Sequence, residues 1–138
     1  MASSASRYLF LFLVGLVVGA FATVVAMRAY DARTDHFPGS VMEVMAWHMG
    51  QLKQDTQQHR CAATDTLPHL QALRTMANDI EPAFPSEHDN QRFGQYASDL
   101  RASLDAALAS PPLNCPGVGT TLAKVGDGCQ ACHREFRD

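Results

Sequence analysis

The chain has 138 residues, of which 46% are apolar and 18% are charged, and a formal net charge of −3. This size favours one folded domain, and the apolar content argues against a disordered chain. No cluster of Lys and Arg is present to neutralise phosphates, so we expect no nucleic-acid partner.

The first predicted element is an uninterrupted apolar segment. Residues 8–27 carry no charge, and Arg7 and Arg28 flank them. About 20 helical residues span roughly 30 Å, which matches the hydrocarbon core of a bilayer. We therefore predict a single-pass transmembrane anchor over residues 1–28. The alternative is a secretory signal cleaved after Ala22, although the apolar region of such signals is usually only about 7–15 residues long.

The remainder of the chain has the composition of a mildly acidic soluble domain. Residues 29–138 contain 9 Lys and Arg against 14 Asp and Glu. We predict a linker over residues 29–39, which are charged and end in Pro and Gly, and a helical domain over residues 40–138. No alternation typical of β-strands and no internal repeat appears in this part.

Four amphipathic helices are predicted in this domain, because apolar residues recur there every three to four positions. Ser40 and Glu43 form a capping-box pattern at the first helix, and Thr66 can cap the second. Short connections between such helices are typical of an antiparallel four-helix bundle. The predicted fold is therefore all-α. The helices are expected over residues 40–60, 66–81, 91–110 and 120–137.

The motif that carries chemistry lies in the last predicted helix. Cys129 and Cys132 are followed directly by His133, which gives the Cys-x-x-Cys-His pattern of c-type haem attachment. Two thiols three residues apart can each bond one vinyl group of the same porphyrin, and the imidazole then lies under the iron. At 100° per residue the three side chains share one arc of about 100°. A thioredoxin-like redox pair would need a βαβ context, which the predicted helices do not provide. A zinc site would need a second pair of ligands with suitable spacing, which Cys61 and Cys115 do not supply.

With this motif at its C-terminal end, a four-helix chain resembles the cytochrome c′ family. The resemblance covers residues 40–137 and includes the Met-Ala-x-His-x-Gly run at residues 45–50. It implies one covalently attached haem c, with His133 as the proximal iron ligand. It also implies that Met42 occupies the distal position, where the low-spin branch of the family uses Met as the sixth ligand. Arg137 matches an Arg that the family has near the proximal imidazole.

The resemblance is incomplete, and other ligands stay open. Pro38 stands where the family often has an Arg near a haem propionate. Met45, His48 and Met49 are alternative sixth ligands, since a stripe of Met residues on a helix is more often packing than ligation. The other histidines are expected at helix ends or in loops, in contact with solvent. Trp47 either covers a neighbouring side chain or contacts a partner chain, for example in a homodimer.

Two further cysteines fall at positions that the bundle would bring to one end. Cys61 ends the first predicted helix and Cys115 precedes the fourth. We predict a disulfide between them, because haem attachment of this type occurs on the oxidising side of the membrane, where disulfides persist. Two unpaired thiols are the alternative.

These features predict a membrane-anchored c-type cytochrome that transfers electrons to or from a membrane-associated redox partner. We expect the anchor in the inner membrane and the haem domain in the periplasm. No general base or nucleophile arrangement appears, so an electron carrier is favoured over an enzyme. The alternatives are a five-coordinate haem protein that binds NO or CO, and an accessory haem subunit of a membrane complex.

Overall fold

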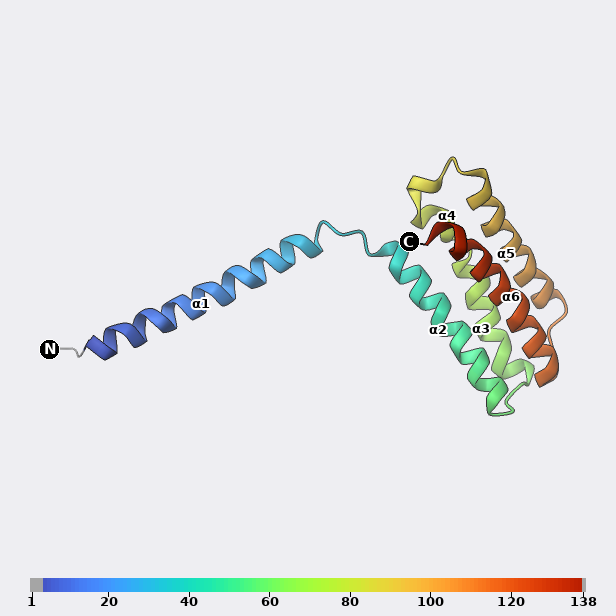
Figure 1. Ribbon diagram of the computed structural model, residues 1–138. Coiled ribbons are helices and arrows are strands. Elements are labelled where there is room, and N and C mark those ends of the chain that lie inside the picture. Colours follow the sequence, from blue (N-terminus) through green and yellow to red (C-terminus); the bar gives the residue numbers. More distant parts are fainter. Residues whose placement is uncertain (1–3, 138) are drawn as a thin grey trace. The chain divides into compact units, whose positions relative to one another are not determined.

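The computed structural model describes residues 4–137, and the side chains of residues 6–137. Residues 1–3 of the predicted anchor and residue 138 of the predicted haem domain lie outside the described residues. Helices account for all regular structure in the described part, which contains no strand, so the predicted all-α fold is confirmed (Figure 1). The chain divides into two compact units, Met1–His36 and Phe37–Asp138.

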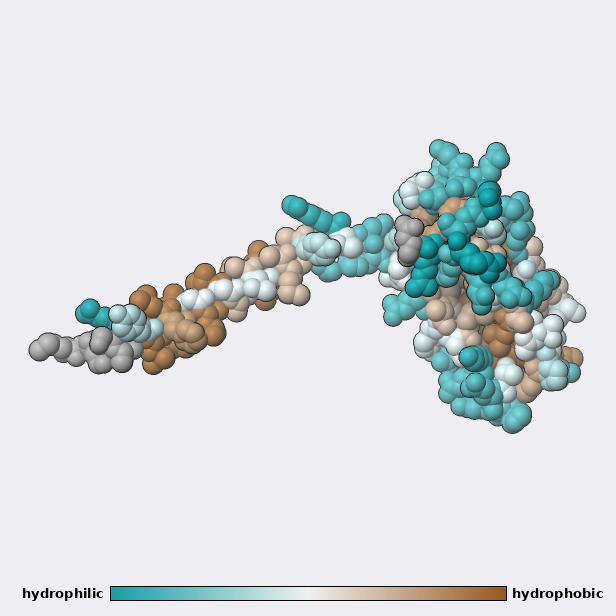
Figure 2. Space-filling model, viewed as in Figure 1, coloured by the Kyte–Doolittle hydropathy of each residue, from teal (hydrophilic) through white to brown (hydrophobic). Residues whose placement is uncertain are grey.

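Helix α1 (Ser4–Asp31) forms the first unit. Its residues 6–31 are long and apolar enough to cross a membrane, and an 18-residue stretch within them has a mean hydropathy of 2.7. Hydrophobic residues cover much of this helix in Figure 2, and their side chains are exposed to the surroundings. The same length and composition are found in membrane spans and in signal sequences. The helix continues three residues beyond the predicted boundary at residue 28.

Helix α2 (Phe37–Gln57) opens the second unit and begins earlier than predicted. Pro38 and Gly39, expected to close the linker, lie in its first turn instead. Proline is tolerated there because the first turn of a helix has no internal partner for its N–H groups. Ser40 is therefore inside the helix, and the predicted capping box at its start is wrong.

Helix α3 (Ala63–Met76) also begins before its predicted start, with Ala62 as the N-cap residue. Thr66 does not cap it, contrary to the prediction. Its side chain is fully buried and its hydroxyl donates to the Ala62 carbonyl oxygen at 3.3 Å. Pro68 lies in the second turn, where its missing N–H removes one helical hydrogen bond.

A short irregular region then leads to the third long helix. It contains α4 (Ile80–Ala83) and the 3₁₀-helix η1 (Pro85–Glu87). Helix α5 (Gln91–Ala109) follows, with bounds close to the prediction. The side chain of Asn90 caps α5 by accepting hydrogen bonds from the N–H groups of Arg92 and Phe93.

Helix α6 (Cys115–Phe136) starts five residues before the predicted position, within a segment that was expected to be a loop. The Oδ1 atom of Asn114 caps it by accepting from the N–H of Gly117 at 2.9 Å. A Cβ atom at Gly117 would lie 3.1 Å from that oxygen and 3.2 Å from Pro112 Cβ, so a larger residue there would require these neighbours to shift by a few tenths of an ångström. Pro116 in the first turn is compatible with the helix for the same reason as in α2.

The four long helices of the second unit, α2, α3, α5 and α6, pack as a bundle. Each packs against the next one along the chain, and α6 also packs against α2. The packed pairs are α2 with α3, α3 with α5, α5 with α6, and α6 with α2 (Figure 1). Their inward positions match the apolar periodicity of the sequence, and the central leucines are fully buried. The most buried large side chains are Leu52, Leu70, Leu73, Leu104, Val118 and Val125.

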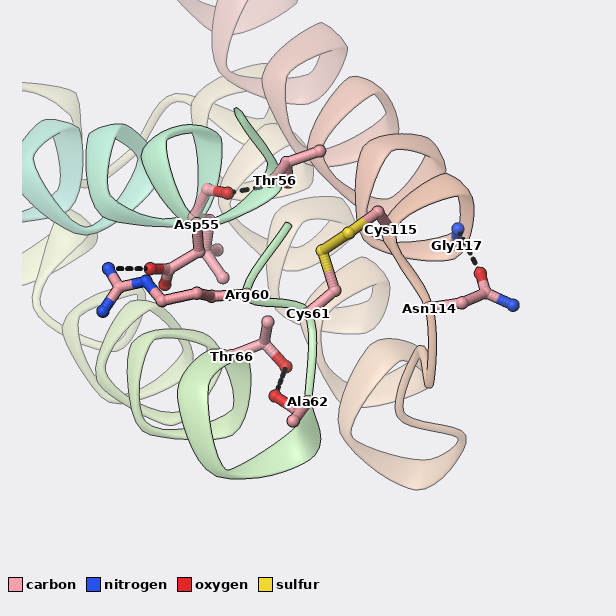
Figure 3. Close-up of a disulfide and its surroundings, with 10 residues drawn as sticks. Asp55, Thr56, Arg60, Cys61, Ala62, Thr66, Asn114, Cys115 and Gly117 are labelled. Atoms are coloured by element: carbon pink, nitrogen blue, oxygen red, sulfur yellow. Dashed lines mark hydrogen bonds and ion pairs between the residues drawn. A yellow bond between two sulfur atoms is a disulfide. The ribbon is translucent and has the colours of Figure 1, made fainter. Parts of the chain in front are cut away.

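The predicted disulfide is present at one end of this bundle. Cys61, in the turn after α2, is bonded to Cys115, the first residue of α6, with a Cα–Cα distance of 5.1 Å (Figure 3). The neighbouring Arg60 donates to Oδ1 of Asp55 at 2.6 Å, and the Asp55 side chain is buried. A covalent link and a charged hydrogen bond thus fix the chain where it passes from α2 to α3.

Candidate haem-binding site

The last three turns of α6 bring the three residues of the predicted attachment motif to one cavity. Cys129, Cys132 and His133 all line it and are all half-buried. This agrees with the shared arc expected from helical spacing. The two cysteines are free thiols, in contrast to the bonded pair at the other end of the bundle.

The cavity has a volume of about 340 Å³ and lies between α2, α5 and α6, with one residue each from α3 and α4. Its lining carries no Lys, Arg, Asp or Glu side chain. Such an apolar chamber with a few polar groups on one wall is typical of a cofactor site. Beside the three motif residues it is lined by Met42, Met45, Ala46, Met49, Leu73, Ile80, Tyr96, Ala97, Leu100, Gly126, Gly128 and Gln130.

Both cysteine thiols lie in surroundings that keep them protonated. Burial raises the pKa of Cys129, and burial followed by the nearby Cys129 and Glu135 raises the pKa of Cys132. A neutral thiol suits an apolar wall, because burying a thiolate there without a cation is costly. The chain therefore supplies two S–H groups and one imidazole at an apolar chamber, and this donor set fits a porphyrin with two vinyl groups.

Met42 reaches the same cavity from α2. It is half-buried and packs against the bundle core. Met45 and Met49, the alternative thioether ligands, also line the cavity. All three methionines of the predicted stripe thus line the site, and a substitution experiment is needed to distinguish their roles.

His48, the fourth candidate ligand, is not among the cavity-lining residues. Its Nδ1 atom lies 2.9 Å from Nδ1 of His69 on α3, and the two ring centroids are 5.2 Å apart. The centroid separation is close to the sum of the N–N distance and the radii of the two rings. The two Nδ1 atoms therefore point directly at each other. This is the geometry of one imidazole donating N–H to the other. A shared metal ion would instead need both lone pairs to converge on a third point.

The prediction that His69 lies at a helix end and in solvent is therefore wrong. Its ring is mostly buried within α3, and Nε2 lies 4.0 Å from Oδ2 of the buried Asp55. Trp47 covers the pair, with ring centroids 4.8 Å from His48 and 5.8 Å from His69, although it stays 56% exposed. Burial and the neighbouring His69 lower the pKa of His48. In the described residues no group of three or more His, Cys, Asp or Glu side chains could hold a metal ion.

Arg137 is not brought into the cavity lining. It follows the end of α6, its N–H donates to the His133 carbonyl oxygen at 3.2 Å, and the residue is exposed. The structure thus places its backbone against the motif histidine and leaves its predicted role beside the imidazole untested.

One cavity-lining residue, Tyr96, was not among the site residues predicted from the sequence. The Tyr96 hydroxyl donates to Oε2 of Glu135 at 3.2 Å, and Arg92 donates to the same oxygen at 2.6 Å. The Tyr96 ring also packs edge-on against Phe136, with centroids 6.1 Å apart. These contacts fix the last turn of α6, directly after His133, against α5.

Comparison with known proteins finds similarity to a cytochrome c-556 from Agrobacterium tumefaciens (strain apple 185). The two chains are 40% identical over 45 residues, which is 33% of this chain and 36% of that relative. The chain thus matches about a third of the relative's length. No family model and no solved structure matches the chain. The similarity supports a c-type cytochrome as the class of protein.

Proposed function

We propose that this chain is a membrane-anchored monohaem c-type cytochrome that carries electrons to or from a membrane-associated redox partner. The observation that carries the proposal is the convergence of Cys129, Cys132 and His133 on one apolar cavity that also receives Met42. Haem supplies a one-electron couple when it is bound in such a site. The similarity to a cytochrome c-556 agrees with this chemistry.

Four residues of the cavity would together bind the haem. Cys129 and Cys132 would each hold one vinyl group by thiol addition, in which the sulfur bonds one vinyl carbon and the S–H hydrogen goes to the other. No external oxidant is needed for this addition. The imidazole of His133 would hold the iron from α6, and the thioether of Met42 would hold it from α2. Two protein ligands that persist in both oxidation states favour electron transfer over ligand capture.

The bonded cysteines support an oxidising compartment for the helical domain. Disulfides persist in the periplasm and are rare in the cytosol, and Cys61 is bonded to Cys115. We therefore propose that the haem domain faces the periplasm while α1 stays in the inner membrane. Only the five residues between Asp31 and Phe37 connect the two helices, so the anchor keeps the domain concentrated near membrane oxidoreductases.

Absorption spectra of the oxidised and reduced protein test the proposal. The native protein should be low-spin, and voltammetry should show one reversible one-electron couple. Met42→Leu, which keeps the side-chain volume but removes the sulfur, should give a high-spin spectrum with the haem still attached. Met45→Leu is the matched control on the same helix and should remain low-spin. A native protein that is already high-spin and binds CO rapidly would instead favour the gas-binding alternative.

A further inference from the structure

The cations of the helical domain are unevenly distributed once its ion pairs are set aside. Every arginine from residue 60 to residue 101 is in an ion pair with a carboxylate. Among the described residues of the second unit, the four cations that are in no ion pair all lie on α2, on α6 or directly after α6, and all are exposed. These four are Lys53, Lys124, Arg134 and Arg137.

Acidic side chains outside ion pairs show the opposite distribution. Five of them lie in the part of the chain that forms α3, α4 and α5, namely Asp65, Asp79, Glu87, Asp89 and Asp99. Within the described residues, α2 and α6 carry only Glu43 and Asp127 of this kind. The α2–α6 side of an otherwise acidic domain is therefore its cationic face.

The haem cavity opens on this same face. Ala46 on α2 and Gln130 on α6 both line the cavity and are exposed, whereas the other lining residues are buried or half-buried. The two helices pack side by side (Figure 1). The cavity therefore reaches solvent between α2 and α6, and an electron donor or acceptor outside the chain comes closest to the cavity at this opening.

The surface next to the opening carries small side chains. A surface hollow adjoins the opening, because Gln130 lines both, and Gly50 and Ala123 are exposed in it. Its charged residues are Lys53 and Asp127. Electron transfer slows steeply with distance, so the lack of long side chains favours close approach by a partner. An uncharged centre with charged residues around it is also typical of protein interfaces.

We propose that the cationic α2–α6 face, around the opening of the haem cavity, is the docking surface for an acidic redox protein. The inference rests on the proposed function and names the surface charge of its redox partner. Opposite charges steer two proteins into productive encounters and raise their association rate. The acidic remainder of the domain repels the same partner, which disfavours docking elsewhere.

An anionic membrane surface is the competing occupant of a cationic face. Membrane-binding segments typically carry clusters of about four to eight neighbouring Lys or Arg residues, or large apolar side chains that insert into the lipid. Here the cations are separated along two helices and alternate with Glu43 and Asp127. The uncharged exposed residues of the face include Ala46, Gly50 and Ala123, which are too small to insert. A protein partner fits this face better.

The test uses the full chain in nonionic detergent and a reduced plant-type ferredoxin, which is a small acidic [2Fe–2S] protein and a strong reductant. One electron passes from the cluster to the ferric haem, and stopped-flow absorbance gives the second-order rate constant. Lys53→Gln/Lys124→Gln should lower this constant roughly fivefold at an ionic strength of about 10 mM, because two of the steering charges are lost. The difference should vanish at about 1 M salt, where charges are screened within about 3 Å.

Gln71→Glu/Ser98→Glu is the matched control, because it changes the net charge by the same amount at exposed positions of α3 and α5. Rate constants are compared at equal driving force, from the reduction potential measured for each protein. The control should stay within about twofold of the native rate constant. If the control slows as much as the lysine variant, only net charge matters and the docking face is overturned.

Chemical modification distinguishes the membrane from a protein partner. The full chain is reconstituted into phosphatidylcholine vesicles, with or without anionic phosphatidylglycerol, and treated with an uncharged amine-acylating reagent. Mass spectrometry should find Lys53 and Lys124 modified to the same extent in both. Protection of both lysines by the anionic lipid would identify the membrane as the occupant and overturn the proposal.

The failure of this inference is distinguishable from the failure of the proposed function. Haem staining after denaturing electrophoresis and voltammetry test the haem independently of any ferredoxin rate. If the haem is attached and redox-active but the lysine variant reacts at the native rate, the docking face is wrong and the proposed function stands. A chain without covalent haem would overturn the proposed function, and the docking face with it.

Discussion

Removing the Cys61–Cys115 disulfide should destabilise the helical domain by about 4 kcal/mol. The bond closes a loop with a sequence separation of 54 residues. In the chain-entropy model such a loop removes about 14 cal/mol/K from the unfolded ensemble, or about 4 kcal/mol at 25 °C. For a unit of about 100 residues this corresponds to a fall in melting temperature of roughly 15–20 °C. Cys61 is 6% exposed, so alanine is the suitable replacement, since serine would bury a hydroxyl group.

The assay is urea unfolding of the Cys61→Ala/Cys115→Ala variant, followed by far-ultraviolet circular dichroism. The native protein is measured with and without a phosphine reductant, which cleaves disulfides but leaves thioether-linked haem in place. Reductant should destabilise the native protein to the level of the variant and have no effect on the variant itself. A variant whose free energy of unfolding lies within about 1 kcal/mol of the oxidised native value would refute the loop-closure argument.

Three further predictions concern the His48–His69 pair, the Arg60–Asp55 ion pair and the anchor. A double-mutant cycle of His48→Ala and His69→Ala at pH 8 should give a coupling free energy of about 1 kcal/mol, typical of one hydrogen bond, and additive single effects would show that no bond exists. Arg60→Ala should cost about 2 kcal/mol of unfolding free energy because it leaves the buried carboxylate of Asp55 without its cation, whereas exposed Lys53→Ala should cost less than about 0.5 kcal/mol. The full chain should sediment with membranes and be extracted only by detergent. Residues 37–138, expressed behind a cleavable export signal, should be soluble and have the same haem spectrum. If the protein made from the full chain is found in the soluble periplasmic fraction, the N-terminal segment is cleaved.

The bundle could be predicted because its core repeats with helical period. Leu70, Leu73, Leu100, Leu104 and Val125 lie at apolar positions with helical spacing, and all five are buried in the structure. The same local logic gave the arc of Cys129, Cys132 and His133. These features depend only on residues a few positions apart in one helix, so periodicity is sufficient to find them.

Helix starts were predicted less well because several of the capping signals mislead. Pro and Gly at residues 38–39 and 116–117 indicate a loop by composition, yet both pairs occupy the first turn of a helix. Thr66 has a capping side chain but uses it on the preceding turn inside α3. At the two Pro-Gly pairs the first-turn N–H groups need no helical partner, so residues that disrupt a helix interior are tolerated there.

Apart from the Cys61–Cys115 disulfide, side-chain contacts between helices could not be predicted. Nothing local links His48 to His69, or Tyr96 to Glu135, because each pair is set by the rotation of two packed helices. The same limit applies to the sixth ligand, since Met42, Met45 and Met49 share one stripe and all reach the cavity. Periodicity predicts which face of a helix carries a side chain, but the packing of the helices determines which residues that side chain contacts.

The central claim is that this chain holds one haem covalently through the motif of α6. The most direct measurement is the intact mass of protein purified from cells that mature c-type cytochromes, followed by mapping of the peptide that contains residues 129–133. The account predicts a mass of one chain plus one haem, a pigmented band after denaturing electrophoresis, and both Cys129 and Cys132 linked to the porphyrin. A chain of unmodified mass, or a pigment that acid–acetone extracts completely, would contradict it.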